Sequence, residues 1–280
     1  MTKPRLMFCT SLLASLFAAA PLALAQEPVV PVDPANPTPA EQLAMGGPEL
    51  TPVVLNAGQL QIRVPLAIGL SKGAGGKPLS LPVDVYYGVN EKLTLGLTHS
   101  YGVVQAVLPY RPGLGICLSS EQYCAKVYDN IGFDAIFQFM PGVIQLAGHG
   151  GLDVLSFDPM MLSLRLGVLF QAPLATNIAI MADPRIWIGL TERDFNKEAL
   201  WLPLAVQFWV NPMIRVSART NLGGPLEDFG DFYFGSLGAF AGFALTDMIE
   251  AFVSFDFTNL YGKNSSADFR ALVIGANFSL

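Results

Sequence analysis

Few residues in this sequence have the types and spacing that catalysis requires. The only histidines are His99 and His149, whereas nucleophilic catalysis needs a nucleophile, a base and an orienting group within hydrogen-bond reach. His99 and Ser100 are neighbours, so a β-strand would place their side chains on opposite faces. In a strand, His149 would lie about 13 Å from Asp153. We therefore predict no catalytic residues and expect a protein that is not an enzyme, with a barrel enzyme as a minor alternative.

One glycine run could suggest a ligand loop. Metal-binding and phosphate-binding loops are often rich in glycine, as is the run Gly148-His149-Gly150-Gly151. One histidine, however, supplies too few metal ligands. Neither a helix nor a phosphate-loop lysine follows it. Glycine within a strand more often marks a bulge or a close approach of two chains. We predict a structural role for this run, no metal site and no cofactor.

The elements that would position these residues are strands with apolar residues at every second position. The clearest is the hairpin 79–102, whose two halves flank the polar turn Val89-Asn90-Glu91-Lys92. Alternation of this kind indicates strands with one apolar face. The apolar positions of the two halves are Leu79, Leu81, Val83, Val85 and Tyr87, followed by Leu93, Leu95 and Leu97.

The pattern continues to the last residue and predicts about 12 strands, each close to the length that a tilted membrane strand needs. Connections alternate between three or four residues and longer stretches rich in Gly and charge, except near Phe157 to Met160. The expected strands are 58–70, the two halves of the hairpin, 128–139, 143–155, 161–172, 177–189, 199–209, 213–221, 231–244, 248–258 and 268–280.

Charged residues gather on the parity opposite the apolar one. If the apolar parity faces lipid, these residues line the lumen of a closed barrel, either as an ion-paired filling or as a polar pore. The candidates are Arg63, Asp84, Asp134, His149, Asp153, Arg165, Asp183, Arg185, Arg215, Arg219, Glu250 and Asp256. We also expect Trp187, Trp201, Trp209 and Tyr233 in the lumen. Aromatic residues near strand ends, including Tyr86, Tyr87 and Tyr128, are expected in interfacial girdles.

Composition and the first residues indicate export. Lys3 and Arg5 precede an apolar stretch that ends at Ala23-Leu24-Ala25, so we predict a signal peptide at 1–25. The stretch 26–57 is rich in proline and is expected to be a periplasmic linker. Removal of the leader leaves 14 basic and 22 acidic residues, a net charge of −8, which disfavours nucleic-acid binding. In an oxidising compartment the two remaining cysteines, Cys117 and Cys124, are expected to form a disulfide.

The whole pattern resembles bacterial outer-membrane β-barrel proteins over roughly residues 55–280. Short turns on one side and long loops on the other are typical of that class. Leu272, Ile274, Ala276, Phe278 and Leu280 share one parity, similar to the C-terminal strand that the barrel-assembly machinery reads, although Leu280 replaces the usual aromatic. The resemblance implies an all-β, transmembrane, antiparallel up-and-down barrel at 58–280. It also implies contact with outer-membrane lipid and both termini in the periplasm.

A soluble sandwich or lipocalin-like barrel would carry lysine freely on its exposed face. Here all seven lysines lie in the leader, in loops or at strand ends, as expected where a lipid-facing Lys costs about 2–4 kcal/mol at mid-depth. The leading functional hypothesis is a narrow, porin-like channel for small polar solutes. The alternative is a non-conducting structural or surface-binding barrel that acts through its long loop 103–127.

Overall fold

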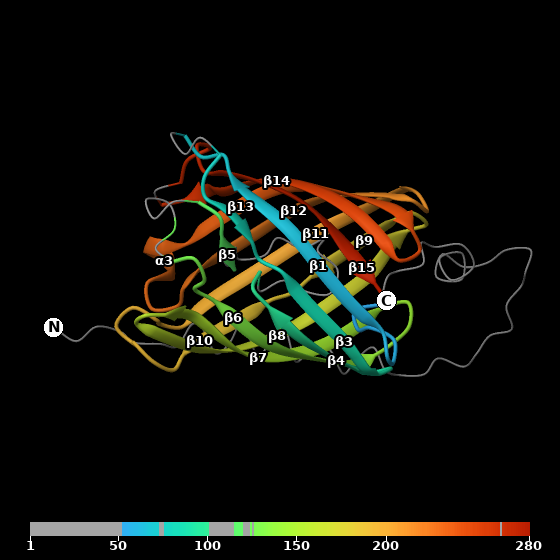
Figure 1. The fold of residues 1–280 in the computed structure, drawn as a ribbon, viewed down its shortest axis with the longest axis horizontal. Helices are drawn as coiled ribbons and strands as arrows, with labels where there is room; N and C mark the ends of the chain where they lie inside the picture. The colour runs from blue at the N-terminus through green and yellow to red at the C-terminus, as the bar shows by residue number, and fades with distance from the viewer. Residues whose placement is uncertain (1–51, 73–75, 101–114, 120–123, 125, 264) are drawn as a thin grey trace, which may run out of the picture. The chain divides into compact units, whose positions relative to one another are not determined.

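The computed structural model describes residues 52–72, 76–100, 115–119, 124, 126–263 and 265–280. These residues form one antiparallel sheet that closes on itself, because β1 pairs with β15 from Gln61↔Ser279 to Gly69↔Ala271. Figure 1 shows the tilted strands wound into a barrel. The first elements are β1 (Leu60–Gly69), β2 (Leu79–Leu81), β3 (Asp84–Asn90), β4 (Leu93–Thr98), β5 (Ile116–Cys117), β6 (Ile131–Met140), β7 (Gln145–Phe157) and β8 (Met160–Ala175).

The second half of the chain continues the wall and contains one short helix. Its elements are β9 (Ile178–Ala182), β10 (Arg185–Gly189), β11 (Ala199–Asn211), β12 (Ile214–Pro225), α3 (Phe229–Phe232), β13 (Phe234–Thr246), β14 (Ile249–Gly262) and β15 (Arg270–Ser279). Within the described part of the chain, no helix is long and apolar enough to cross a bilayer.

The wall contains 12 strands, as the sequence predicts. Two of these wall strands are interrupted. Pro82 and Val83 separate β2 from β3, and Asp183 and Pro184 separate β9 from β10. Pro82 and Pro184 have no backbone N–H to donate to the ladder at these two breaks. The wall itself stays continuous, because β9 and β10 both pair with β8 and β11.

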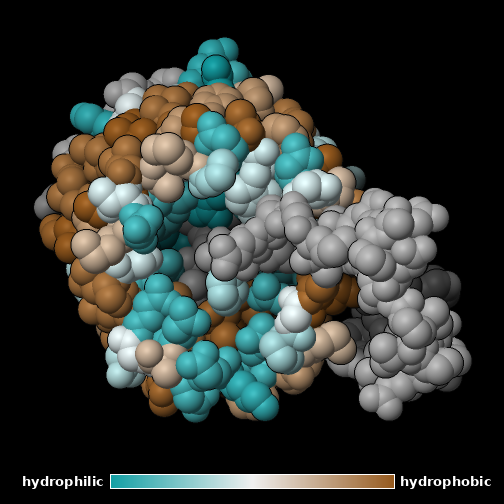
Figure 2. Space-filling model, turned by 90° about the vertical axis from the view of Figure 1, so that its right-hand side faces the viewer, coloured by the Kyte–Doolittle hydropathy of each residue, from teal (hydrophilic) through white to brown (hydrophobic). Residues whose placement is uncertain are grey.

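The two faces of the wall have opposite chemistry. In β6, Phe133 and Phe137 are each about half exposed, whereas Asp134 is completely buried. This alternation places apolar side chains on the outside and polar ones in the lumen, as in outer-membrane barrels. Figure 2 looks onto the end with the short turns and shows hydrophilic residues around a recess, with hydrophobic residues on the outer wall.

Several predicted boundaries were wrong. The turn expected at Pro173 to Thr176 is shorter, since β8 continues to Ala175 and β9 begins at Ile178. The strand expected at 231–244 begins at Phe234, because α3 occupies the preceding residues. The turns after β3, β6, β8, β11 and β13 are short and lie at one end, called here the short-turn end, and α3 lies at the other, long-loop end (Figure 1).

Part of the predicted loop 103–127 joins the wall instead of leaving it. The two residues of β5 pair with β2 through Ser80↔Cys117, and the Cys117 N–H donates to the Val127 carbonyl at 2.7 Å. β5 therefore adds to the sheet beside β2, in the part of the wall that lies beyond the end of β4. The structure records a disulfide between Cys117 and Cys124, with Cα atoms 6.2 Å apart. Residues 103–114 of the loop lie outside the described residues.

The chain also enters the barrel earlier than the predicted linker boundary at residue 57. Val53, Val54 and Leu55 are buried. The Val53 N–H donates to Gln145 Oε1 at 2.9 Å, and the Leu55 N–H donates to Thr94 Oγ1 at 2.8 Å. Both acceptors are buried residues of the inner face, so this segment lies inside the barrel. The expected signal peptide 1–25 and residues 26–51 of the linker lie outside the described residues.

Candidate functional site

All twelve charged residues that the sequence assigns to the lumen lie on the inner face of the wall. Ten are buried, and the side chains of Arg215 and Glu250 are 12% and 20% exposed. Each of the twelve takes part in an ion pair with another of the set. Buried charges are costly unless paired and hydrogen-bonded, which explains why none is isolated.

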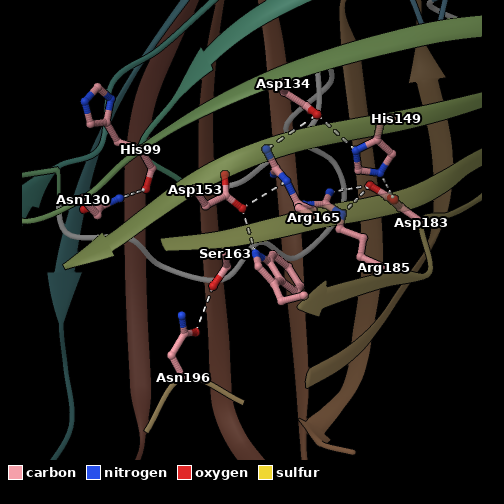
Figure 3. Close-up of polar contacts among 11 residues, drawn as sticks. His99, Asn130, Asp134, His149, Asp153, Ser163, Arg165, Asp183, Arg185 and Asn196 are labelled. Carbon is pink, nitrogen blue, oxygen red and sulfur yellow. Dashed lines mark hydrogen bonds and ion pairs between the residues drawn. The ribbon is translucent and has the colours of Figure 1, made fainter. Parts of the chain in front are cut away.

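The largest group of charges is centred on His149 and extends over β6 to β10 (Figure 3). His149 Nε2 lies 2.7 Å from Asp183 Oδ1, and Nδ1 lies 3.4 Å from Asp134 Oδ1. Arg185 Nε donates to Asp183 Oδ2 at 2.8 Å. Arg165 Nη2 lies 3.6 Å from Asp134 Oδ1. One connected network therefore joins charges from neighbouring strands.

The same network reaches the long-loop end through Asp153. Arg165 Nε lies 3.3 Å from Asp153 Oδ2, which also accepts the Trp187 Nε1–H at 2.8 Å. Sequence reasoning placed Trp187 in the lumen as a bulky group but missed its role as a hydrogen-bond donor to a carboxylate. Cross-strand partners follow from register, which the sequence does not reveal.

A second group forms around Asp84. Arg63 Nε donates to Asp84 Oδ2 at 3.0 Å, and Arg63 Nη2 donates to Ser100 Oγ at 2.7 Å. Asp84 Oδ1 also accepts the backbone N–H groups of His99 and Ser100 at 2.7 and 3.0 Å. Ser100 was not among the predicted lumen residues. Asp84 therefore fixes both an arginine and the point where the chain leaves β4.

The third group lies on β12 to β14 and has the form of a ladder. Arg215 Nε and Nη2 donate to the two Glu250 oxygens at 2.5 and 2.7 Å. Arg219 makes the equivalent pair with Asp256, with Nε 2.9 Å from Oδ1. The Phe240 ring lies between the two arginines, with its centroid 5.3 Å from Arg215 Cζ and 5.9 Å from Arg219 Cζ. Each guanidinium thus combines a carboxylate partner with a cation–π contact.

Glycine lies beneath four of these bridges. Gly151 separates Asp134 from Arg165, and a Cβ there would lie 3.3 Å from Asp134 Oδ1 and 3.0 Å from Arg165 Nη2. Gly167 lies beneath His149 in the same way, Gly238 beneath Asp256, and Gly242 beneath Arg215 and Glu250. Because each glycine has no side chain, the neighbouring charged groups lie along the wall and reach across one strand to their partners.

The short-turn half of the lumen contains an apolar layer. Val53, Val54 and Leu55 pack into it together with inward residues from β3, β6 to β9, β11 and β13 to β15. Those residues are Tyr86, Ile136, Ala147, Leu169, Met181, Ala205, Phe240, Phe252 and Val273. The segment before β1 therefore fills the centre of an apolar ring.

For two aromatic residues, the prediction of whether they lie inside the lumen was wrong. Tyr86 was expected in an interfacial girdle but is completely buried inside the barrel, with its ring over Gly96. Tyr233 was expected in the lumen but caps α3 and stacks on Phe229. Trp187 and Trp201 are buried in mutual contact, whereas Trp209 lies opposite Arg215 and is half-buried.

Comparison with known proteins identifies the architecture. No protein-family model and no curated protein matches the sequence. Among solved structures, the KdgM porin in complex with disordered oligogalacturonate aligns with a TM-score of 0.53 and 7% identity, over 79% of this chain and 99% of that one. The NanC porin aligns with a TM-score of 0.54 and 10% identity, over 79% and 100%. This chain therefore has the porin-like fold of an outer-membrane β-barrel.

A third solved structure, an outer-membrane channel from Pseudomonas putida F1, aligns over 83% of the present chain and 100% of its own. Its TM-score is 0.54 at 12% identity. At such identities the likeness concerns the fold.

Proposed function

We propose that this barrel is a narrow outer-membrane channel for small polar solutes, with its short-turn end and both termini in the periplasm. The twelve lumen charges are its proposed pore-lining residues. This orientation follows the usual arrangement of short periplasmic turns and long external loops. It also leaves the C-terminal strand available to the barrel-assembly machinery, which we propose as a partner.

The observation that carries the proposal is the glycine beneath each of four charge bridges. Side chains that fill a lumen point toward its axis, whereas the bridges over Gly151, Gly167, Gly238 and Gly242 follow the wall. A barrel of eight strands is narrow enough for side chains to fill its interior. A barrel of 12 strands is wider and encloses more room. Charged groups held along the wall keep their side chains away from the axis. Ten of the twelve are buried in this structure, and in the proposed open channel they would give solutes a polar surface.

The segment Val53 to Leu55 acts, in this proposal, as the closure of the channel. It fills the apolar ring near the short-turn end, and a dry apolar constriction excludes water and polar solutes. Two backbone hydrogen bonds to Gln145 and Thr94 hold it there. Release of the segment would open the path without any change in the wall.

The same closure supports a second candidate, a sealed structural or surface-binding barrel. Swelling of proteoliposomes separates the two. We expect liposomes that contain the full-length Leu55→Asp variant to swell in isosmotic arabinose and much less in isosmotic stachyose, a larger sugar. Wild-type liposomes should swell more slowly than those with the variant. A correctly folded variant that gives no swelling in arabinose would refute the channel and favour the sealed barrel.

A further inference from the structure

A cavity of about 400 Å³ lies at the long-loop end of the barrel, and none of the twelve lumen charges lines it. Leu155, Trp187, Ala199, Trp201 and Phe234 contribute its apolar and aromatic lining, and Asn196 contributes an amide. Its volume falls within the range of small-molecule sites, which are mostly apolar with a few fixed polar groups.

The aromatic side of the cavity is rigidly constructed. The Trp201 ring lies over Gly223, where a Cβ would approach Cε3 to 2.6 Å, so the indole lies along the inner face of β12. Its centroid is 5.4 Å from that of Phe234 and 6.5 Å from that of Trp187, which meets it at 90°. Two indoles and one phenyl ring thus form adjoining faces that suit a flat ring.

The polar groups at the cavity are nearly all occupied. Trp187 donates its indole N–H to Asp153. Asn196 Nδ2 donates to the carbonyls of Leu162 and Thr191, and its Oδ1 accepts from Ser163. Trp201 Nε1 is buried and has no hydrogen-bond partner among the described residues. Lys197 also lines the cavity and is paired with Glu227. The unpaired Trp201 N–H has almost no accessible surface, so the described lining offers aromatic surface without an accessible free donor.

We propose that this cavity binds a small neutral molecule with one flat, largely apolar ring and at most one polar group, such as a monocyclic aromatic alcohol. The ring would pack on the faces of the indole and phenyl rings. A polyhydroxylated sugar fits poorly, because its hydroxyl groups would be buried without hydrogen-bond partners. The proposal does not depend on conduction through the lumen.

Heavy-atom quenching of tryptophan fluorescence tests the proposal, because the chain has three tryptophans and two of them line the cavity. The probe is 4-bromobenzyl alcohol, added to the full-length barrel in lipid nanodiscs that carry Trp209→Phe. We expect quenching that saturates. The matched control carries Trp187→Phe and Trp201→Phe and retains only Trp209, for which we expect weak, linear quenching from collisions and lipid partitioning.

Two further variants locate the site. In the Trp209→Phe background, Ala199→Phe fills the cavity and should weaken probe binding by about tenfold or more. Trp201→Ala removes the ring that lies between Trp187 and Phe234, and it should weaken probe binding by a similar factor. Folding of each variant is checked by the different gel migration of boiled and unboiled protein. Linear quenching throughout, unchanged affinity in both variants, or displacement of the probe by methyl glucoside would overturn the proposal.

Discussion

Replacing Leu55 by aspartate should open the short-turn end of the barrel. Leu55 is 5% exposed and belongs to the apolar layer that also contains Tyr86, Ile136 and Phe252. An aspartate there would place a carboxylate among apolar groups. The neighbouring Ala57 is exposed, so Ala57→Asp adds the same charge to the same segment outside the layer.

The expected size of the effect follows from the burial of Leu55. Loss of a buried leucine side chain removes about 1.5–3 kcal/mol of hydrophobic stabilisation. Burial of an unpaired carboxylate costs several kcal/mol more. A combined change of about 4 kcal/mol shifts the equilibrium between seated and released segment by almost three powers of ten. The wall should remain intact, since its pairing does not involve Leu55.

Single-channel recording in planar bilayers measures this equilibrium directly. We expect Leu55→Asp to spend most of its time in a conducting state, and wild type and Ala57→Asp to open rarely and equally. Equal open fractions in all three proteins would show that the segment does not close the lumen. An increase in both variants would show that added charge, and not loss of the apolar contact, opens the channel.

Three other predictions address the wall, the loop and the location. In the Leu55→Asp background, Gly242→Ala should lower conductance, since its methyl group would displace Arg215 and Glu250 toward the axis. Gly150→Ala, whose Cβ meets an outward leucine at an ordinary 3.4 Å, should not. Peptide mapping without reduction should recover Cys117 linked to Cys124, a small ring worth about 2 kcal/mol on the loop-entropy model; free thiols in both would contradict it. Cell fractionation should place the protein in the outer membrane, and recovery in the soluble periplasm would contradict that assignment.

The wall of the barrel could be predicted from sequence because lipid and lumen impose opposite chemistry on alternate residues. Phe133 and Asp134 are adjacent in sequence, yet one is half exposed on the outside and the other is fully buried inside. Period-two patterning therefore identified the strands and the inward charges. The ends of the strands were predicted less accurately. A residue typical of turns, such as Pro173, can also occupy the last positions of a strand when the turn lies outside the membrane.

The pairing of the charges could not be predicted, because it depends on register between strands distant in sequence. Arg215 and Glu250 are 35 residues apart and meet across β13 at Gly242. The glycine is visible in the sequence, but its role appears only when the neighbouring strands are aligned. Val53 to Leu55 were missed for a related reason. Their proline-rich context suggests a linker, whereas the apolar ring that buries them comes from strands throughout the chain.

The pairing of charges also bears on which solutes the proposed channel would favour. Five arginines and six carboxylates face the lumen together with His149, and each lies within an ion pair. Opposite charges a few ångströms apart largely cancel at the distance of a solute on the axis. Such a wall retains hydrogen-bonding groups but exerts little net field. It therefore suits neutral polar solutes better than ions, which are selected by rings of uncompensated charge.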